Sequence, residues 1–162
     1  MTTTVMANYS YGEDCYQEIP KVLKSYGIHR VALIGGKRAL AATEKEVREI
    51  LSKAGIETTG SFVYGGDSTQ TNIDKLVAKP AVQEADAIFG FGGGRALDTT
   101  KMVAKELDKP TFTFPTICSN CSAGTAIAVV YKDDHSVLRY GYPNSPLHIF
   151  INTRVIAQAP SK

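Results

Sequence analysis

Short apolar runs alternate with amphipathic helical patterns along most of this chain, and few folds accommodate that alternation. The runs expected to form buried strands are 29–36, 58–64, 85–91 and 111–114. The patterns 38–53, 69–78 and 95–107 predict helices, and a further amphipathic helix is expected over 14–26, with Pro20 as a local weakness. Strands and helices in this order, with short connections, predict an α/β fold with an open, mostly parallel sheet and helices on both faces.

The pattern changes after Pro115. Two β-rich runs, 125–132 and 136–140, flank the polar residues 133–135 and predict a β-hairpin. One more short apolar run covers 147–151, and the last residues from Val155 onward end where another helix could begin. We therefore expect that the chain is cut at a boundary between elements.

Length and charge narrow the function classes. The 162 residues suit one domain, and 18 basic against 16 acidic side chains give a net charge of +2, which offers no general electrostatic reason to bind nucleic acid or a membrane. No apolar run approaches the length of a membrane span, and the N-terminus lacks the features of a secretory signal. Three cysteines give no disulfide framework. These observations predict a cytoplasmic domain.

The strongest local signal is an apolar strand that runs into Gly92, Gly93 and Gly94 and then into a helix. Glycines let backbone N–H groups approach a ligand, and a helix N-terminus favours an anion, so a phosphate site is expected. The spacing matches the dinucleotide fingerprint only loosely and is not a P-loop; the alternative is a tight turn. Asp98 and Lys101, one helical turn apart, are candidate nucleotide contacts beside it, or else a surface ion pair.

Two more segments follow predicted strands. The loop 115–125 is rich in hydroxyl and thiol groups, and its Cys118-x-x-Cys121 spacing permits a zinc half-site or a redox pair, although a polar loop with incidental thiols explains it better. Gly36, Lys37 and Arg38 stand where an acidic residue would bind a free adenosine ribose. Two cations there favour a ribose 2′-phosphate; the alternative is a solvated helix start.

Together these segments resemble the iron-containing (group III) alcohol dehydrogenases, in the glycerol and hydroxycarboxylate dehydrogenase branch. The resemblance runs over nearly all of the chain. It rests on the pattern GGG-x-x-x-D-x-x-K at 92–101, on the proline-threonine loop at 115–119 and on the hairpin 128–142 with Tyr131 in its first strand.

The resemblance implies a Rossmann-like dinucleotide-binding domain over 1–154, and 155–162 would begin a second, metal-binding domain that is absent from this chain. It implies an enzyme that binds NADP or NAD, holds zinc or iron only through the missing domain, and moves hydride to or from a small alcohol, polyol or 2-hydroxy acid. This fragment alone would be inactive. A homo-oligomer is one option for its assembly.

The resemblance also carries over site residues. The cofactor-binding positions are Gly36, Lys37, Arg38, Gly92, Gly93, Gly94, Arg95, Asp98, Lys101, Thr116, Ser119, Thr125, Ile127 and Tyr131. Cys121 takes the place of the aspartate that contacts glycerol in glycerol dehydrogenases, and a thiol is no substitute for that carboxylate. With the two cations, this cysteine favours the hydroxycarboxylate dehydrogenases, which reduce 2-oxo acids with a phosphorylated nicotinamide. No metal ligand can be assigned.

Two alternatives stay open at this point. One is a relative of dehydroquinate synthase, which shares the architecture and a glycine loop but fits the short proline-threonine loop and the hairpin less well. The other is a non-catalytic nucleotide-binding or oligomerisation module.

Overall fold

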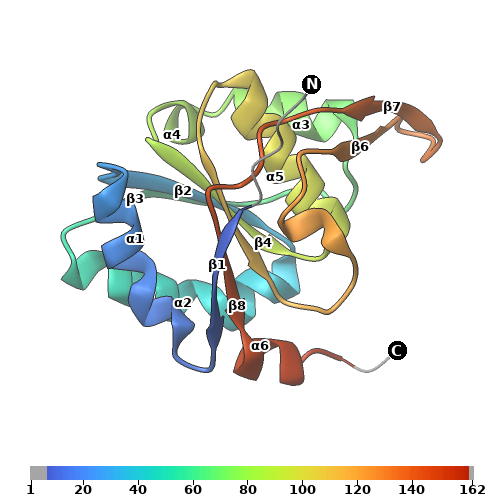
Figure 1. Cartoon of the computed structure of the whole chain (residues 1–162). Coiled ribbons are helices and arrows are strands. Elements are labelled where there is room, and N and C mark those ends of the chain that lie inside the picture. Colours follow the sequence, from blue (N-terminus) through green and yellow to red (C-terminus); the bar gives the residue numbers. More distant parts are fainter. Residues whose placement is uncertain (1–6, 161–162) are drawn as a thin grey trace, which may run out of the picture.

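A six-stranded, fully parallel sheet with the order β1-β8-β5-β4-β2-β3 forms the centre of the computed structural model, which describes residues 7–160 (Figure 1). Its strands are β1 (Asn8–Gly12), β2 (Arg30–Gly35), β3 (Glu57–Val63), β4 (Ala87–Gly92), β5 (Thr111–Pro115) and β8 (His148–Asn152). The hairpin of β6 (Ala128–Tyr131) and β7 (Val137–Gly141) is a separate antiparallel pair. The expected sheet and hairpin are confirmed.

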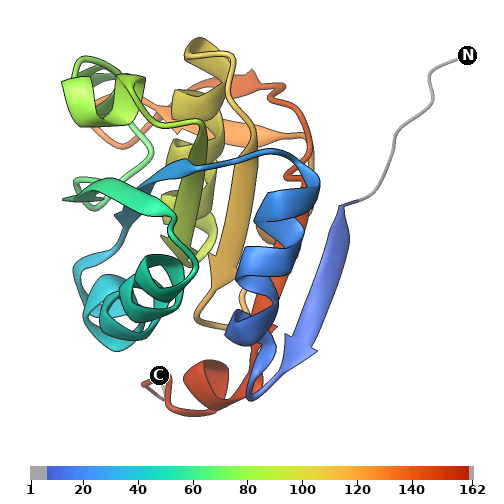
Figure 2. The same cartoon turned by 90° about the vertical axis from the view of Figure 1, so that its left-hand side faces the viewer.

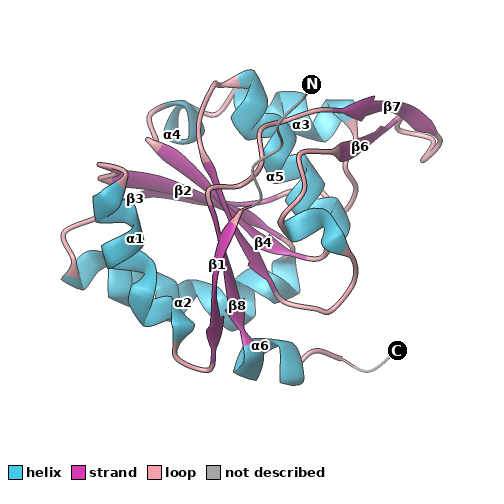
Figure 3. Ribbon diagram, viewed as in Figure 1, coloured by secondary structure: helices cyan, strands magenta, loops and turns pink. Residues whose placement is uncertain are grey.

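Helices cover both faces of the sheet (Figures 2 and 3). The helices are α1 (Ile19–Ser25), α2 (Lys37–Lys53), α3 (Gln70–Val77), α4 (Pro80–Gln83), α5 (Gly94–Glu106) and α6 (Thr153–Ala157), with 3-10 turns η1 (Cys15–Glu18) and η2 (Cys121–Ala123). One core joins α1, α2 and α6 to the aromatic side chains of β4, β5 and β8. The other joins α3, α4, α5 and β6 to the opposite face.

The chain reverses its winding between β2 and β4. The connection after β2 passes through α2 to β3, whereas the connection after β4 passes through α5 to β5 on the other side. Because α2 and α5 belong to opposite faces, the ends of β2 and β4 flank a topological switch point, where open α/β sheets bind ligands.

One expected helix is interrupted. The single helix expected over 14–26 is divided into η1 and α1, and Pro20 lies in the first turn of α1, where its missing N–H has no helical partner to lose. Near the end of the described chain, α6 follows β8 directly, and Val155 of this helix packs in the core. Within residues 7–160, no helix has both the length and the apolar character needed to cross a bilayer.

Candidate functional site

Loops that follow four neighbouring strands enclose a cleft of about 780 Å³ at the carboxyl edge of the sheet. The strands are β5, β4, β2 and β3, and β6 of the hairpin closes the remaining side. The cleft is lined by Gly36, Lys37, Arg38, Ala39, Val63, Tyr64, Gly66, Gly92, Gly93, Gly94, Arg95, Ala96, Asp98, Thr116, Ile117, Asn120, Val129 and Tyr131. It therefore lies at the switch point of the sheet.

Two long helices begin at this cleft without a side-chain cap. The N-cap of α2 is Gly36 and the N-cap of α5 is Gly93, and neither residue has a side chain that could accept a hydrogen bond from the first N–H groups of its helix. By contrast, Thr69 caps α3 and Asn152 caps α6 through their side-chain oxygens. The first N–H groups of α2 and α5 are therefore left for solvent or a ligand, with the positive ends of both helix dipoles beside them.

The glycines of the loop after β4 are needed for close packing. Gly92 has φ +135°, a conformation that side chains rarely adopt. A Cβ at Gly93 would lie 2.7 Å from Ile117 Cδ1, and a Cβ at Gly94 would lie 2.9 Å from Asn120 Nδ2. Ile117 and Asn120 thus rest directly on the glycine loop, which has no room for side chains beneath them.

Cations gather on the walls of the cleft. Lys37 and Arg38 are exposed at the start of α2, and Arg95 is 56% exposed in the first turn of α5. The Arg95 guanidinium lies 5.3 Å from the centre of the Tyr131 ring and 3.3 Å from Asp67 Oδ1. Its charge is partly compensated, whereas no ion pair involves Lys37 or Arg38 among the described residues. The arrangement favours an anionic ligand.

Asp98 and Lys101 form an ion pair that is buried at Lys101 and reaches the cleft at Asp98, so it is not a surface pair. Lys101 Nζ lies 3.1 Å from Asp98 Oδ1, and the Lys101 side chain has no exposed area. Burial lowers the pKa of Lys101, and the neighbouring carboxylate opposes that shift. Lys101 also donates to the carbonyl oxygen of Ile127 at 2.6 Å. Its ammonium thus faces main-chain oxygens behind the wall of the cleft.

A second hollow of about 630 Å³ adjoins the cleft and shares Arg38, Ala39, Thr116 and Ile117 with it. Its remaining lining comes from Ala42 and from the C-terminal segment, through Val155, Gln158, Ala159 and Pro160. The surfaces of this hollow are largely apolar. The two hollows are therefore neighbours with different linings: one is cationic and glycine-lined, and the other is largely apolar.

The predicted site residues divide into two groups. The cleft brings together Gly36, Lys37, Arg38, Gly92, Gly93, Gly94, Arg95, Asp98, Thr116 and Tyr131. The lining does not include Lys101, Ser119, Thr125, Ile127 or Cys121. Cys118 and Cys121 are exposed free thiols on the loop that bears Ile117 and Asn120. Among residues 7–160, no cluster of three or more His, Cys, Asp or Glu side chains is arranged to hold a metal ion.

The loop after β3 contributes residues that the sequence reasoning missed. Asp67 is buried, receives the N–H of Ser68, and lies 2.6 Å from Nδ1 of His135 at the tip of the hairpin, so it joins this tip to Arg95. Tyr64 donates to the carbonyl oxygen of Gly66, and burial, followed by the charge of Asp67, raises the pKa of its phenol. The signal was Gly65-Gly66-Asp67 at the carboxyl end of a predicted strand, the same arrangement that marks the loop after β4.

Comparison with known proteins gives a consistent result. The family model for iron-containing alcohol dehydrogenases matches residues 10–160. A glycerol dehydrogenase of Escherichia coli is 30% identical over 95% of this chain, and hydroxycarboxylate dehydrogenase A of Escherichia coli is 26% identical over 96%. This chain covers 42% of the length of each of these relatives.

A solved structure shows the same fold. Sulfoacetaldehyde reductase from Bifidobacterium kashiwanohense, in complex with NAD+, superposes with a TM-score of 0.83 at 14% identity, and the match covers 99% of this chain and 48% of the reductase. The family model covers residues 10–160, and this range includes all the residues that line the cleft. The chain belongs to the iron-containing alcohol dehydrogenases and corresponds to their N-terminal region.

Proposed function

We propose that this chain is the dinucleotide-binding part of an NAD(P)-dependent, metal-dependent oxidoreductase that acts on a small alcohol, a polyol or a 2-hydroxy acid. The observation that carries the proposal is the pair of uncapped N-termini of α2 and α5 at one cleft. The unpaired N–H groups and helix dipoles favour a doubly charged group such as a pyrophosphate.

The chemistry of the site fits such a cofactor part by part. The pyrophosphate would lie beside the first turn of α5, whose N-cap is Gly93, and Arg95 would neutralise part of its charge. The adenine ring would occupy the apolar hollow beside Ile117 and Val155. The nicotinamide half would then lie toward Asp98, Val129 and Tyr131 at the other end of the cleft. When bound, the nicotinamide supplies the hydride acceptor or donor for the reaction.

We assign no metal ligands among residues 7–160, because no cluster of side chains there is arranged to hold a metal ion. The proposed part of this chain is to bind and orient the dinucleotide. For the substrate, Cys121 supports a 2-hydroxy acid over glycerol, since a thiol is a poor acceptor for the hydroxyl groups that a carboxylate would bind.

The central test is Gly93→Val, assayed by calorimetric titration with NADPH and NADH. A branched side chain at this position would stand where the phosphate approaches, so affinity should fall at least tenfold, which is about 1.4 kcal/mol. The same side chain would also crowd Ile117, since a Cβ there lies 2.7 Å from Cδ1.

The variants Ile117→Ala and Gly93→Val with Ile117→Ala separate these two effects. The double variant relieves the crowding but keeps the obstruction, so its affinity should stay at least tenfold below that of Ile117→Ala. Recovery of binding in the double variant, or unchanged affinity in a folded Gly93→Val protein, would mean that the loop is only a turn.

A further inference from the structure

Lys101 is a buried cation whose three N–H donors all face oxygen atoms. Its ammonium lies 3.1 Å from Asp98 Oδ1, 2.6 Å from the carbonyl oxygen of Ile127 and 3.3 Å from that of Thr125. Removing an ammonium from water is costly unless it is paired and fully hydrogen-bonded. A side chain in such surroundings fixes the position of the groups that solvate it.

The partner of Lys101 extends the same network. Asp98 Oδ1 accepts a hydrogen bond from Ser122 Oγ at 2.5 Å, and Asp98 Oδ2 accepts one from the N–H of Val129 at 3.0 Å. The pair therefore connects α5 with η2, with the segment 125–127 and with the start of β6. These pieces follow one another between β5 and the hairpin, and 125–127 itself belongs to no strand or helix.

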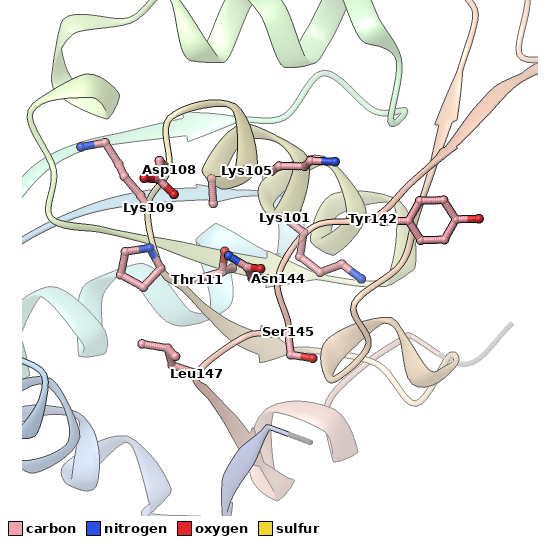
Figure 4. Close-up of a pocket in the computed structure, with 11 residues that line it drawn as sticks. Lys101, Lys105, Asp108, Lys109, Thr111, Tyr142, Asn144, Ser145 and Leu147 are labelled. Carbon is pink, nitrogen blue, oxygen red and sulfur yellow. The ribbon is translucent and has the colours of Figure 1, made fainter. Parts of the chain in front are cut away.

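The segment 125–127 leads directly into the nicotinamide end of the proposed site. Asp98, which pairs with Lys101, lines the cleft, and so does Val129, whose N–H binds Asp98. Tyr131, two residues after Val129, lines it as well. Lys101 itself lines a different hollow of about 310 Å³ between α5 and the connection from β7 to β8 (Figure 4). It thus acts on the cleft only through main-chain atoms and Asp98.

We propose that Lys101 is a positioning residue, which touches no cofactor atom and holds the main chain at Thr125 and Ile127 so that the wall around Asp98 and Val129 fits the nicotinamide half of the dinucleotide. This inference rests on the proposed function. It predicts a selective effect, because the adenosine and pyrophosphate contacts come from α2, the glycine loop and the apolar hollow, none of which Lys101 touches.

The experiment compares two pairs of probes, and the two members of each pair differ only in the nicotinamide. The first pair is NADPH and 2′-phosphoadenosine diphosphate ribose, and the second is NADH and adenosine diphosphate ribose. Each probe is titrated into the parent protein, Lys101→Met and Lys105→Met, and its affinity is measured. Lys105 lies one turn further along α5, is exposed and lines the same hollow as Lys101, so it is the matched control (Figure 4). Melting temperatures are recorded for each protein.

Lys101→Met should lower the affinity for NADPH and NADH at least tenfold and abolish the rise in nicotinamide fluorescence on binding. The affinities for the two probes that lack nicotinamide should change less than twofold. Lys105→Met should leave all four affinities within twofold. Equal loss for fragments and dinucleotides would show a merely structural role, and no change for either would show no role; both results would overturn the inference.

If Lys101→Met does not fold, Lys101→Gln, whose neutral amide has two N–H donors in place of the three of the ammonium, is measured in the same way, with the same selective loss expected and the same two contrary results. A parent protein that binds none of the four probes would instead refute the proposed function, so the two failures are distinguishable.

Discussion

Lys37 and Arg38 are the two single residues that place positive charge at the start of α2 in the cleft. Both are exposed in the first turn of α2, where a positive side chain gains nothing from the helix dipole. Gly36, which precedes them, has no carboxylate for a ribose hydroxyl. A ligand with an extra phosphate at this place would use both features.

We accordingly expect a preference for NADP over NAD. A charge-assisted hydrogen bond is worth about 1.5–3 kcal/mol, so one such bond gives about a tenfold preference or more. Paired dissociation constants should show this in the parent, and Lys37→Ala or Arg38→Ala should reduce it while leaving NAD affinity nearly unchanged. Equal affinity for the two cofactors in the parent would make these cations a solvated helix start and would weaken the case for a hydroxycarboxylate dehydrogenase.

The three cysteines should differ sharply in reactivity. Cys15 is buried, and burial, followed by the charge of Glu46, raises the pKa of its thiol to about 11. Because the thiolate is the reactive form, iodoacetamide at pH 8 should label Cys118 and Cys121 in the native protein and Cys15 only after unfolding. Peptide mass spectrometry measures this directly. Labelling of Cys15 at the rate of the other two would contradict its burial.

The edge strand β1 shows how elements of this fold are held in register. It pairs in parallel with β8, and His148 Nε2 lies 2.7 Å from Ser10 Oγ across that pair. Burial lowers the pKa of His148, which means that the folded protein favours the neutral ring. The folded state therefore binds fewer protons at this residue than the unfolded chain.

The sign of the pH effect follows. The contribution of a neutral His148 is present above the ordinary pKa of 6.5 and is lost as pH falls through the lower folded value. The free energy of unfolding of the parent, minus that of His148→Gln, should decrease on acidification from pH 7. Urea titrations at several pH values measure the difference, with Ser10→Ala as the control that keeps the histidine. A difference that is independent of pH would refute the shift.

The elements that the sequence predicts well are those with a buried apolar run or a long helical period, such as β2, β4, α2 and α5. The strand β1 was missed because its sequence, Asn8 to Gly12, lacks an apolar run: Tyr9 and Tyr11 are exposed at the edge of the sheet. The first hairpin strand begins at Ala128 and not at Thr125, since Lys101 takes the carbonyl groups at 125 and 127. Such tertiary contacts are invisible to local patterns.

At the scale of the whole molecule, the reversal of winding between β2 and β4 assembles the site. It brings the segments around Gly36, Gly93 and Thr116 to one edge, and the predicted parallel sheet already placed the loops after its strands at that edge. The sequence could not predict how far each side chain lies from the cleft. Lys101 is buried behind the residues that line the cleft, and Asp67 contacts the lining residue Arg95. Both depend on how the hairpin packs against α3 and α5, far apart in sequence.

A nicotinamide dinucleotide that binds across the N-termini of α2 and α5, as proposed, would contact the backbone amides of both helix starts. At 17.5 kDa, the protein suits mapping of backbone amide chemical shifts during a titration with NADPH. We expect saturable binding of one molecule per chain, with the largest shifts at the amides of 36–39 and 93–96 together. No saturable change, or changes that leave either helix start unaffected, would contradict it.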